Sequence, residues 1–133
     1  MKILFIGDDL IVQRFKRALQ EEEIDVVDNP ELLSIPGLIE QNEYDLAIID
    51  FAFSGARTIS NRIADLALMP VVVIMDQNEE SWKIVPSFNA DAFVPEDSSN
   101  AEIFARIKAV YRRSMRNQLT IAGQHSNFHR FRI

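Results

Sequence analysis

Apolar residues along this chain gather in short unbroken runs, separated by stretches in which they recur at helical spacing. One such run, Leu46–Ile49, ends at the carboxylate of Asp50, and similar runs occupy residues 3–6 and 71–75. A short apolar run with polar boundaries is typical of a strand buried on both faces of a sheet. In an open α/β sheet, ligands bind at the carboxyl ends of such strands, which is where Asp50 would lie.

Between these runs, apolar residues recur every three or four positions, which predicts helices. The helical stripes span residues 10–19, 59–67 and 101–116. Weaker patterns predict an edge strand at 24–27, a short helix at 79–88 and a fifth strand at 90–94. In the segment 30–42, Pro36 and Gly37 interrupt the helix-forming residues, so we expect a broken helix there.

Strands and helices therefore alternate along the chain, which indicates a parallel sheet with helices on both faces. Because crossovers between parallel strands are right-handed, the favoured architecture is a three-layer, doubly wound α/β sandwich. The carboxyl ends of its strands would bring Gly7 and Asp8, Asp50, Met75 and Asp76, and Glu96 to one rim of the sheet.

Composition narrows the function classes. The 133 residues suit a single domain, and no apolar run is long enough to cross a membrane. The absence of cysteine excludes disulfides, thiol catalysis and cysteine-based zinc sites. No signal-peptide pattern opens the sequence, so we expect a cytoplasmic protein without membrane contact.

Charge is distributed unevenly. Residues 1–102 contain all 20 acidic residues and 7 Lys or Arg, a net charge of −13, whereas residues 103–133 contain 7 Lys or Arg and no acid. A basic block of this kind can mark a nucleic-acid arm, a junction with another domain or a solvated helix face. This block is only 31 residues long, so we do not expect the segment itself to bind DNA.

The order of these motifs resembles that of response-regulator receiver domains, the flavodoxin-like module exemplified by CheY. The resemblance extends over residues 1–116 and implies a five-stranded parallel sheet with strand order 2-1-3-4-5. Its motifs are the opening segment 1–9, Asp50 at the end of the third strand, and the segments 70–74 and 89–93. Residues 102–113 are similar to the last receiver helix of OmpR/PhoB-type transcription factors.

The resemblance implies roles for several residues. Asp50 matches the phosphoacceptor, and Asp8 matches the second acid of the pair that holds Mg²⁺ with it, which makes Asp8 and Asp50 candidate metal ligands. Gly7 takes the place of the first acid, and Asp9 follows one position late, where it would cap a helix. Phe93 matches the aromatic switch position of the fifth strand.

Two departures from the family pattern change the expected chemistry. Met75 takes the position of the Thr or Ser that hydrogen-bonds the phosphoryl group, and Glu96 takes the position of the Lys that neutralises it. Like charges about 4 Å apart repel by roughly 4 kcal/mol at an effective dielectric constant near 20. An acidic pocket of Asp8, Asp9 and Glu96 around Asp50 therefore predicts a pseudo-receiver, unless another base such as Arg57 replaces the missing cation.

If Asp50 is phosphorylated weakly or not at all, we expect the protein to function through the surfaces by which it binds other molecules. The resemblance implies a homodimer through the face of the fourth helix, fifth strand and fifth helix, with Asp91, Arg106, Phe104 and Val110 on it. Residues 117–133 would be a linker or the start of a winged-helix DNA-binding domain that the sequence does not include. Two short strands are expected there, at 119–121 and 128–133.

The sequence thus predicts a non-enzymatic receiver module in two-component signal transduction, dimerising to control a transcriptional output domain. DNA contact would come only through that output domain, and a sensor histidine kinase is the candidate upstream partner. A conventional Mg²⁺-dependent phosphoaccepting receiver is the first alternative. A small metal-dependent hydrolase with Asp50 as nucleophile is the second, and no residue stands in an obvious general acid–base position for it.

Overall fold

The computed structural model describes residues 1–27, 44–66 and 69–127, with side chains as far as Arg116. The expected broken helix at 30–42 lies outside the described residues. Strands β1 (Lys2–Ile6), β2 (Glu23–Val27), β3 (Leu46–Asp50), β4 (Val71–Met75) and β5 (Ala92–Pro95) form the sheet. The described helices are α1 (Asp9–Ala18), α3 (Ala56–Asp65), α4 (Glu79–Trp82), the 3-10 turn η2 (Val85–Ser87) and α5 (Asn100–Asn127).

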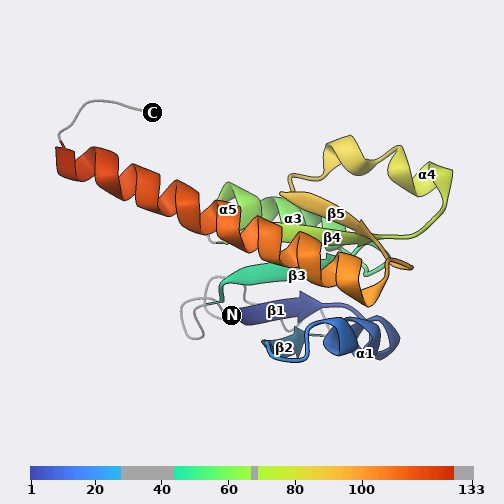
Figure 1. Cartoon of the computed structure of the whole chain (residues 1–133). Coiled ribbons are helices and arrows are strands. Elements are labelled where there is room, and N and C mark those ends of the chain that lie inside the picture. The colour runs from blue at the N-terminus through green and yellow to red at the C-terminus, as the bar shows by residue number, and fades with distance from the viewer. Residues whose placement is uncertain (28–43, 67–68, 128–133) are drawn as a thin grey trace.

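All strands run parallel in the order β2-β1-β3-β4-β5, which confirms the predicted flavodoxin-like fold. Helices α1 and α5 lie side by side on one face of the sheet, and α3 covers the opposite face (Figure 1). Every residue of β3 and β4 is buried, as the unbroken apolar runs predict for central strands covered on both faces.

The core is divided by the sheet into two apolar clusters. One joins alternate residues of the central strands to Ile59 and Ile63 of α3 and to Phe88. The other joins the remaining strand residues to Phe15 of α1 and to Ile103 and Ile107 of α5. Because successive strand residues point to opposite faces, a continuous apolar run supplies both clusters at once.

Two predicted elements differ from the structure. The expected helix at 79–88 is reduced to the single turn of α4 followed by η2, because Pro86 lacks the backbone N–H that a continuing helix needs. The fifth strand begins at Ala92 instead of residue 90.

The largest correction concerns the C-terminal part of the chain. Helix α5 continues to Asn127, so the strand expected at 119–121 is wrong, and the one expected at 128–133 lies outside the described residues. With 28 residues, α5 extends well past the edge of the sheet (Figure 1). One glycine, Gly123, does not end a helix, because glycine in a helix interior costs only about 1 kcal/mol.

Candidate functional site

Asp50 is the last residue of β3, at the carboxyl rim of the sheet. Its side chain is only 6% exposed, and its Oδ1 accepts a hydrogen bond of 3.0 Å from the backbone N–H of Ala52. The β3–α3 turn is fixed by two further backbone bonds, from Phe51 N–H to the Ile74 carbonyl and from Phe53 N–H to the Asp50 carbonyl. The carboxylate is thus placed by both the sheet and the turn, as the sequence predicts.

Asp8 lies beside Asp50 and has a structural role of its own. It is the N-cap of α1, where its Oδ1 accepts a 3.1 Å hydrogen bond from Ile11 N–H. Asp9 is the first helical residue and is exposed, so the expectation that Asp9 caps this helix is wrong. Of Asp8 and Asp9, it is Asp8 whose negative charge raises the pKa of Asp50.

Gly7 occupies the place of the first metal-binding acid, and its neighbours leave little space for a side chain. A β-carbon added to Gly7 would lie 3.0 Å from Cβ of Asp50 and 3.0 Å from the ring of Phe5. Contacts this short force something to move, because a packed core has few gaps to absorb an added carbon. The close packing of β1 against Asp50 therefore depends on glycine.

The end of β4 contributes an apolar residue and then an acid. Met75 is fully buried in the same cluster as Phe88, and the half-buried Phe93 packs against that cluster. The thioether of Met75 has no hydroxyl group that could form a hydrogen bond at the rim. Asp76 follows it, and its carbonyl accepts a 2.8 Å hydrogen bond from the indole of Trp82.

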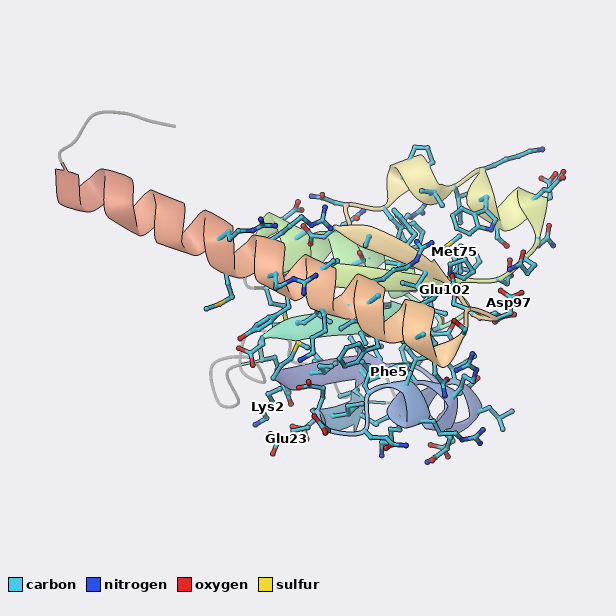
Figure 2. The ribbon with its side chains drawn as sticks, in the orientation of Figure 1. Lys2, Phe5, Glu23, Met75, Asp97 and Glu102 are labelled. Atoms are coloured by element: carbon cyan, nitrogen blue, oxygen red, sulfur yellow. The ribbon has the colours of Figure 1, made fainter. Side chains whose placement is uncertain are left out.

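Glu96 follows β5 and is tied to the end of β4. Its backbone N–H donates to the Met75 carbonyl at 2.7 Å, and its side chain is exposed. The loop after it is held on both sides, because Gln77 donates to Asp97 at 2.5 Å and Arg14 of α1 donates to the Ser98 carbonyl. Figure 2 shows Met75 and Asp97 at the same end of the sheet. Ser98 is buried in this loop, and its hydroxyl has no hydrogen-bond partner among the described residues.

The rim is therefore an acidic site. Burial, together with the negative charges of Asp8 and Asp76, raises the pKa of Asp50, although the Ala52 N–H opposes the shift. The pKa of Glu96 is also raised, by partial desolvation of this largely exposed carboxyl and by the negative charges of Asp76, Asp50 and Asp97. Within the described part of the chain, none of the ion pairs involves Asp50, Asp76 or Glu96, and Arg57 is not paired with them.

Asp76 is a rim residue to which the sequence assigns no role. Its place directly after an apolar strand predicts that it lies at the rim, but its position before Gln77 and Asn78 is equally typical of an ordinary turn. Its carboxylate does stabilise that turn, because Asp76 Oδ1 accepts a 2.9 Å hydrogen bond from Asn78 N–H. In addition, its negative charge raises the pKa of Asp50.

The predicted metal ligands are Asp8 and Asp50. Among the described residues, no three acidic or histidine side chains converge in an arrangement suited to a metal ion. Hard cations such as Mg²⁺ prefer oxygen ligands, which Asp8 and Asp50 carry. These two carboxylates remain the candidate ligands.

Of the four residues predicted for a dimer face, two lie together at the β5 edge and one is buried. Asp91 accepts a 2.7 Å hydrogen bond from Val71 N–H, and Arg106 donates to the Phe93 carbonyl at 3.3 Å, so both lie at the β5 edge. Val110 is 3% exposed and belongs to the core, which excludes it from a surface patch. Phe104 is 45% exposed but lies under Lys108, whose ammonium bonds Glu22 on the α1 side of α5.

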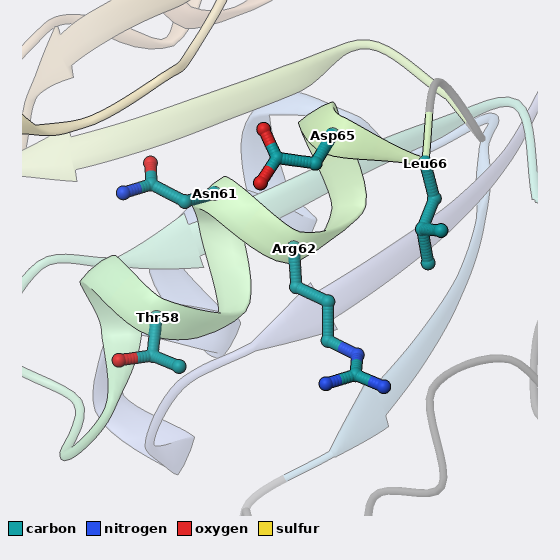
Figure 3. A pocket seen from close by; sticks show the side chains of 5 residues that line it. All are labelled: Thr58, Asn61, Arg62, Asp65 and Leu66. Carbon is teal, nitrogen blue, oxygen red and sulfur yellow. The ribbon is translucent and has the colours of Figure 1, made fainter.

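A shallow hollow lies elsewhere, on the outer side of α3 (Figure 3). Its volume is about 450 Å³. It is lined by Thr58, Asn61, Arg62, Asp65 and Leu66. Asn61 is engaged in the fold, since its side chain accepts from Asn89 N–H and donates to the Ser87 carbonyl. This hollow is separate from the rim that carries Asp50.

Solved structures with similar folds include response regulators and receiver domains. A putative response regulator from Chloroflexus aurantiacus J-10-fl is 20% identical, with a TM-score of 0.70 over 84% of this chain and 97% of that one. The N-terminal domain of NsrR, a lantibiotic response regulator, is 21% identical with a TM-score of 0.67, over 83% of this chain and 97% of that one. The beryllofluoride-activated receiver domain of Klebsiella pneumoniae RstA is 17% identical with a TM-score of 0.71, over 84% and 99%.

No protein-family model matches the chain. Among the described residues, no helix combines the length and apolar character needed to cross a membrane. At sequence identities of 17–21%, the structural similarity shows a shared fold. The chain has the CheY-like fold of response-regulator receiver domains.

Proposed function

We propose that this chain is an atypical receiver module of two-component signal transduction, in which Asp50 undergoes little or no phosphorylation. The observation that carries the proposal is the composition of the rim, where the negative charges of Asp8 and Asp76 act on Asp50 and a further carboxylate, Glu96, follows β5. Phosphoryl transfer to a carboxylate brings two negative groups together and needs cations and donors to stabilise the transition state. This rim instead has carboxylates at the positions where cations and hydrogen-bond donors are needed.

Two further features support the proposal. Met75 is buried in the core, so a phosphoryl group on Asp50 would find no hydroxyl there to hydrogen-bond. Gly7 packs against Asp50 so closely that an acid at that position would not fit without displacing its neighbours. Without these groups, a signal would pass through association with other molecules, through surfaces that include α5.

A conventional Mg²⁺-dependent phosphoacceptor is the second candidate. It is favoured by the buried Asp50 at the end of β3 and by Asp8 beside it, two carboxylates that suit Mg²⁺. In that case a sensor histidine kinase would be the upstream partner. In both cases we propose a non-enzymatic, cytoplasmic module with residues 117–133 leading to a transcriptional output domain, which would make the DNA contacts.

Trp82 provides a direct test of the two candidates. It is the chain's single tryptophan, and its indole N–H donates to the Asp76 carbonyl at the rim. We expect Mg²⁺ with beryllofluoride, a phosphoryl mimic, to leave the intrinsic fluorescence unchanged. A saturable fluorescence change that disappears in the Asp50→Asn variant would establish the conventional receiver instead.

A further inference from the structure

We propose that the later turns of α5 bind a short acidic segment of another protein, whose apolar side chain enters a hollow beside Met115 and whose carboxylates pair with Arg112 and Arg116. The proposal deepens the proposed function, and it rests on that function for the idea that this module acts by association. Its test measures binding of a peptide and not phosphorylation of Asp50, so either proposal can fail without the other.

A second hollow lies along the later turns of α5. It is lined by Tyr111, Arg112, Met115 and Arg116, and its volume is about 460 Å³. Residues four apart lie one above the other on a helix, so Tyr111 and Met115 form one row. Arg112 and Arg116 form a second row beside it for the same reason. The hollow therefore has an apolar side and a cationic side.

The apolar row is anchored by the fold at one end and exposed at the other. Tyr111 is half-buried and packs against the core cluster that contains Ile107 and Val110. Met115 is 41% exposed, although its side chain is apolar. Because a flexible thioether adapts to the shape of its neighbours, this row can accommodate an apolar side chain of a partner.

The cationic row belongs to a segment of α5 that has no acidic residue. Residues 103–116 contain no Asp or Glu, and their basic residues are Arg106, Lys108, Arg112, Arg113 and Arg116. Two of these are engaged in the fold, since Arg106 donates to a carbonyl of β5 and Lys108 bonds Glu22. Arg112 and Arg116 are exposed, and neither takes part in the ion pairs formed by the described residues. Their guanidinium groups can therefore bind the carboxylates of a partner, each through two parallel hydrogen bonds.

The two rows together favour a short acidic segment as the occupant. Such a segment carries carboxylates and apolar side chains side by side, so it can use both rows at once. Exposed charges are largely screened beyond about 8 Å at physiological ionic strength. A segment confined to the hollow is therefore affected mainly by the basic residues around it.

The rest of the chain argues against a larger anionic partner. The later part of α5 projects beyond the sheet, which leaves room for a segment to approach (Figure 1). Residues 1–102 carry a net charge of −13, so a long polyanion such as duplex DNA would be repelled where it extended past the hollow. A second copy of the chain would bring the same excess of negative charge. A short segment avoids this repulsion, and its small interface should give a weak, transient complex.

Fluorescence anisotropy with a labelled peptide tests the proposal on the full chain. The probe is a short capped peptide with leucines in one row and glutamates in the row beside it, at helical spacing. We expect saturable binding that weakens as salt is added. A matched peptide with glutamine in place of glutamate should bind at least about tenfold more weakly, because hydrogen bonds between charged groups are stronger than neutral ones.

Variants of the chain then locate the site. We expect Arg112→Gln and Arg116→Gln each to weaken binding of the glutamate peptide and to have little effect on the glutamine peptide. Met115→Gln, which replaces the thioether by a polar group of similar length, should weaken binding of both peptides. Arg113→Gln is the control, because Arg113 is exposed on the same helix, carries the same charge and does not line the hollow. Far-UV circular dichroism confirms that each variant is folded.

Other outcomes would overturn the proposal. A wild-type chain that shows no saturable binding of the glutamate peptide has no such site. Equal weakening by Arg113→Gln and Arg112→Gln would show a diffuse attraction to a basic helix instead of a defined hollow. Binding of duplex DNA or of phosphatidylserine vesicles through Arg112 and Arg116, without binding of the peptide, would assign the hollow to a different occupant.

Discussion

Gly7 and Asp50 are packed so closely that a β-carbon on Gly7 would lie 3.0 Å from that of Asp50. The residue after β1 is thus packed closely against the end of β3, and a side chain at position 7 would meet both Asp50 and Phe5. This packing yields a prediction about stability.

Replacing Gly7 by alanine should destabilise the fold. The added methyl group must displace Asp50 or the Phe5 ring, and overpacking of this kind costs about 1–3 kcal/mol. Urea denaturation measures the change in the free energy of unfolding. An unchanged or increased free energy would mean that β1 and β3 can separate at no cost, and the packing argument would be wrong.

Asp50→Asn should stabilise the protein at neutral pH. The folded state raises the pKa of Asp50, so ionising this carboxyl costs more in the folded than in the unfolded chain, and stability falls as the pH rises through the folded pKa. The asparagine keeps an oxygen for the Ala52 N–H and removes the charge. We expect a gain on the order of 1 kcal/mol, a typical size for a single substitution.

That gain should disappear in acid, below the ordinary Asp pKa of 3.8, where the carboxyl is protonated in both states. Urea titrations from neutral to acidic pH measure the difference between the variant and the wild type. A gain that stays constant across this range would have another cause than the charge on Asp50.

Glu22 should show the opposite pH dependence. Its carboxylate bonds Lys108 and the N-terminal ammonium, each at 2.7 Å. Burial alone would raise the pKa of Glu22, but these cations outweigh it and hold the pKa below its ordinary value. The stability that Glu22 contributes is therefore present above its ordinary pKa and is lost as the pH falls through the folded pKa.

Lys108→Met is the variant that tests this cluster. At neutral pH it leaves a poorly exposed carboxylate with one partner fewer, which should cost about 1–3 kcal/mol. The deficit should shrink in acid, where Glu22 is protonated. Lys83→Met, which removes an exposed pair with Glu80, is the control and should change stability by less than about 0.5 kcal/mol. Equal effects of the two variants would count against a special role for Glu22.

Reversing the charge at position 96 should move the rim toward conventional receiver chemistry. A lysine there replaces a carboxylate that repels Asp50 and Asp76 with a cation that attracts them. We expect Glu96→Lys, and more so the double variant with Met75→Thr, to bind beryllofluoride with Mg²⁺ at least about tenfold more tightly, equivalent to about 1.4 kcal/mol. Fluorescence of Trp82 follows the binding, and Glu96→Gln separates loss of repulsion from gain of a cation.

Much of the fold could be predicted because the central strands are buried on both faces. Unbroken apolar runs such as Val71–Met75 have little alternative to a central parallel strand, and Asp50 was located at the rim by the same argument. The elements that were misjudged are those that the core does not fix. Around Pro86, the missing backbone N–H of proline interrupts the expected helix and leaves a 3-10 turn. After Arg116, the helix continues through residues whose sequence pattern resembles short strands.

The site could be predicted only in part, because its chemistry depends on contacts between distant strands. Asp8, Asp50 and Glu96 were identified from their positions after strands. Asp76 was placed at the rim in the same way but was given no role, since only the three-dimensional arrangement shows that its charge acts on Asp50. The family resemblance placed Val110 on the dimer face, whereas the structure puts this residue in the core, as its helical spacing with Ile103 and Ile107 indicates.

The central claim is that Asp50 does not act as an ordinary phosphoacceptor, and intact-mass spectrometry tests it most directly. The wild-type chain is incubated with Mg²⁺ and acetyl phosphate, a small-molecule phosphoryl donor, beside the Asp50→Asn variant. We predict that neither protein gains the mass of a phosphoryl group. A phosphorylated species that forms on the wild type and is absent from Asp50→Asn would contradict the account and identify a conventional receiver.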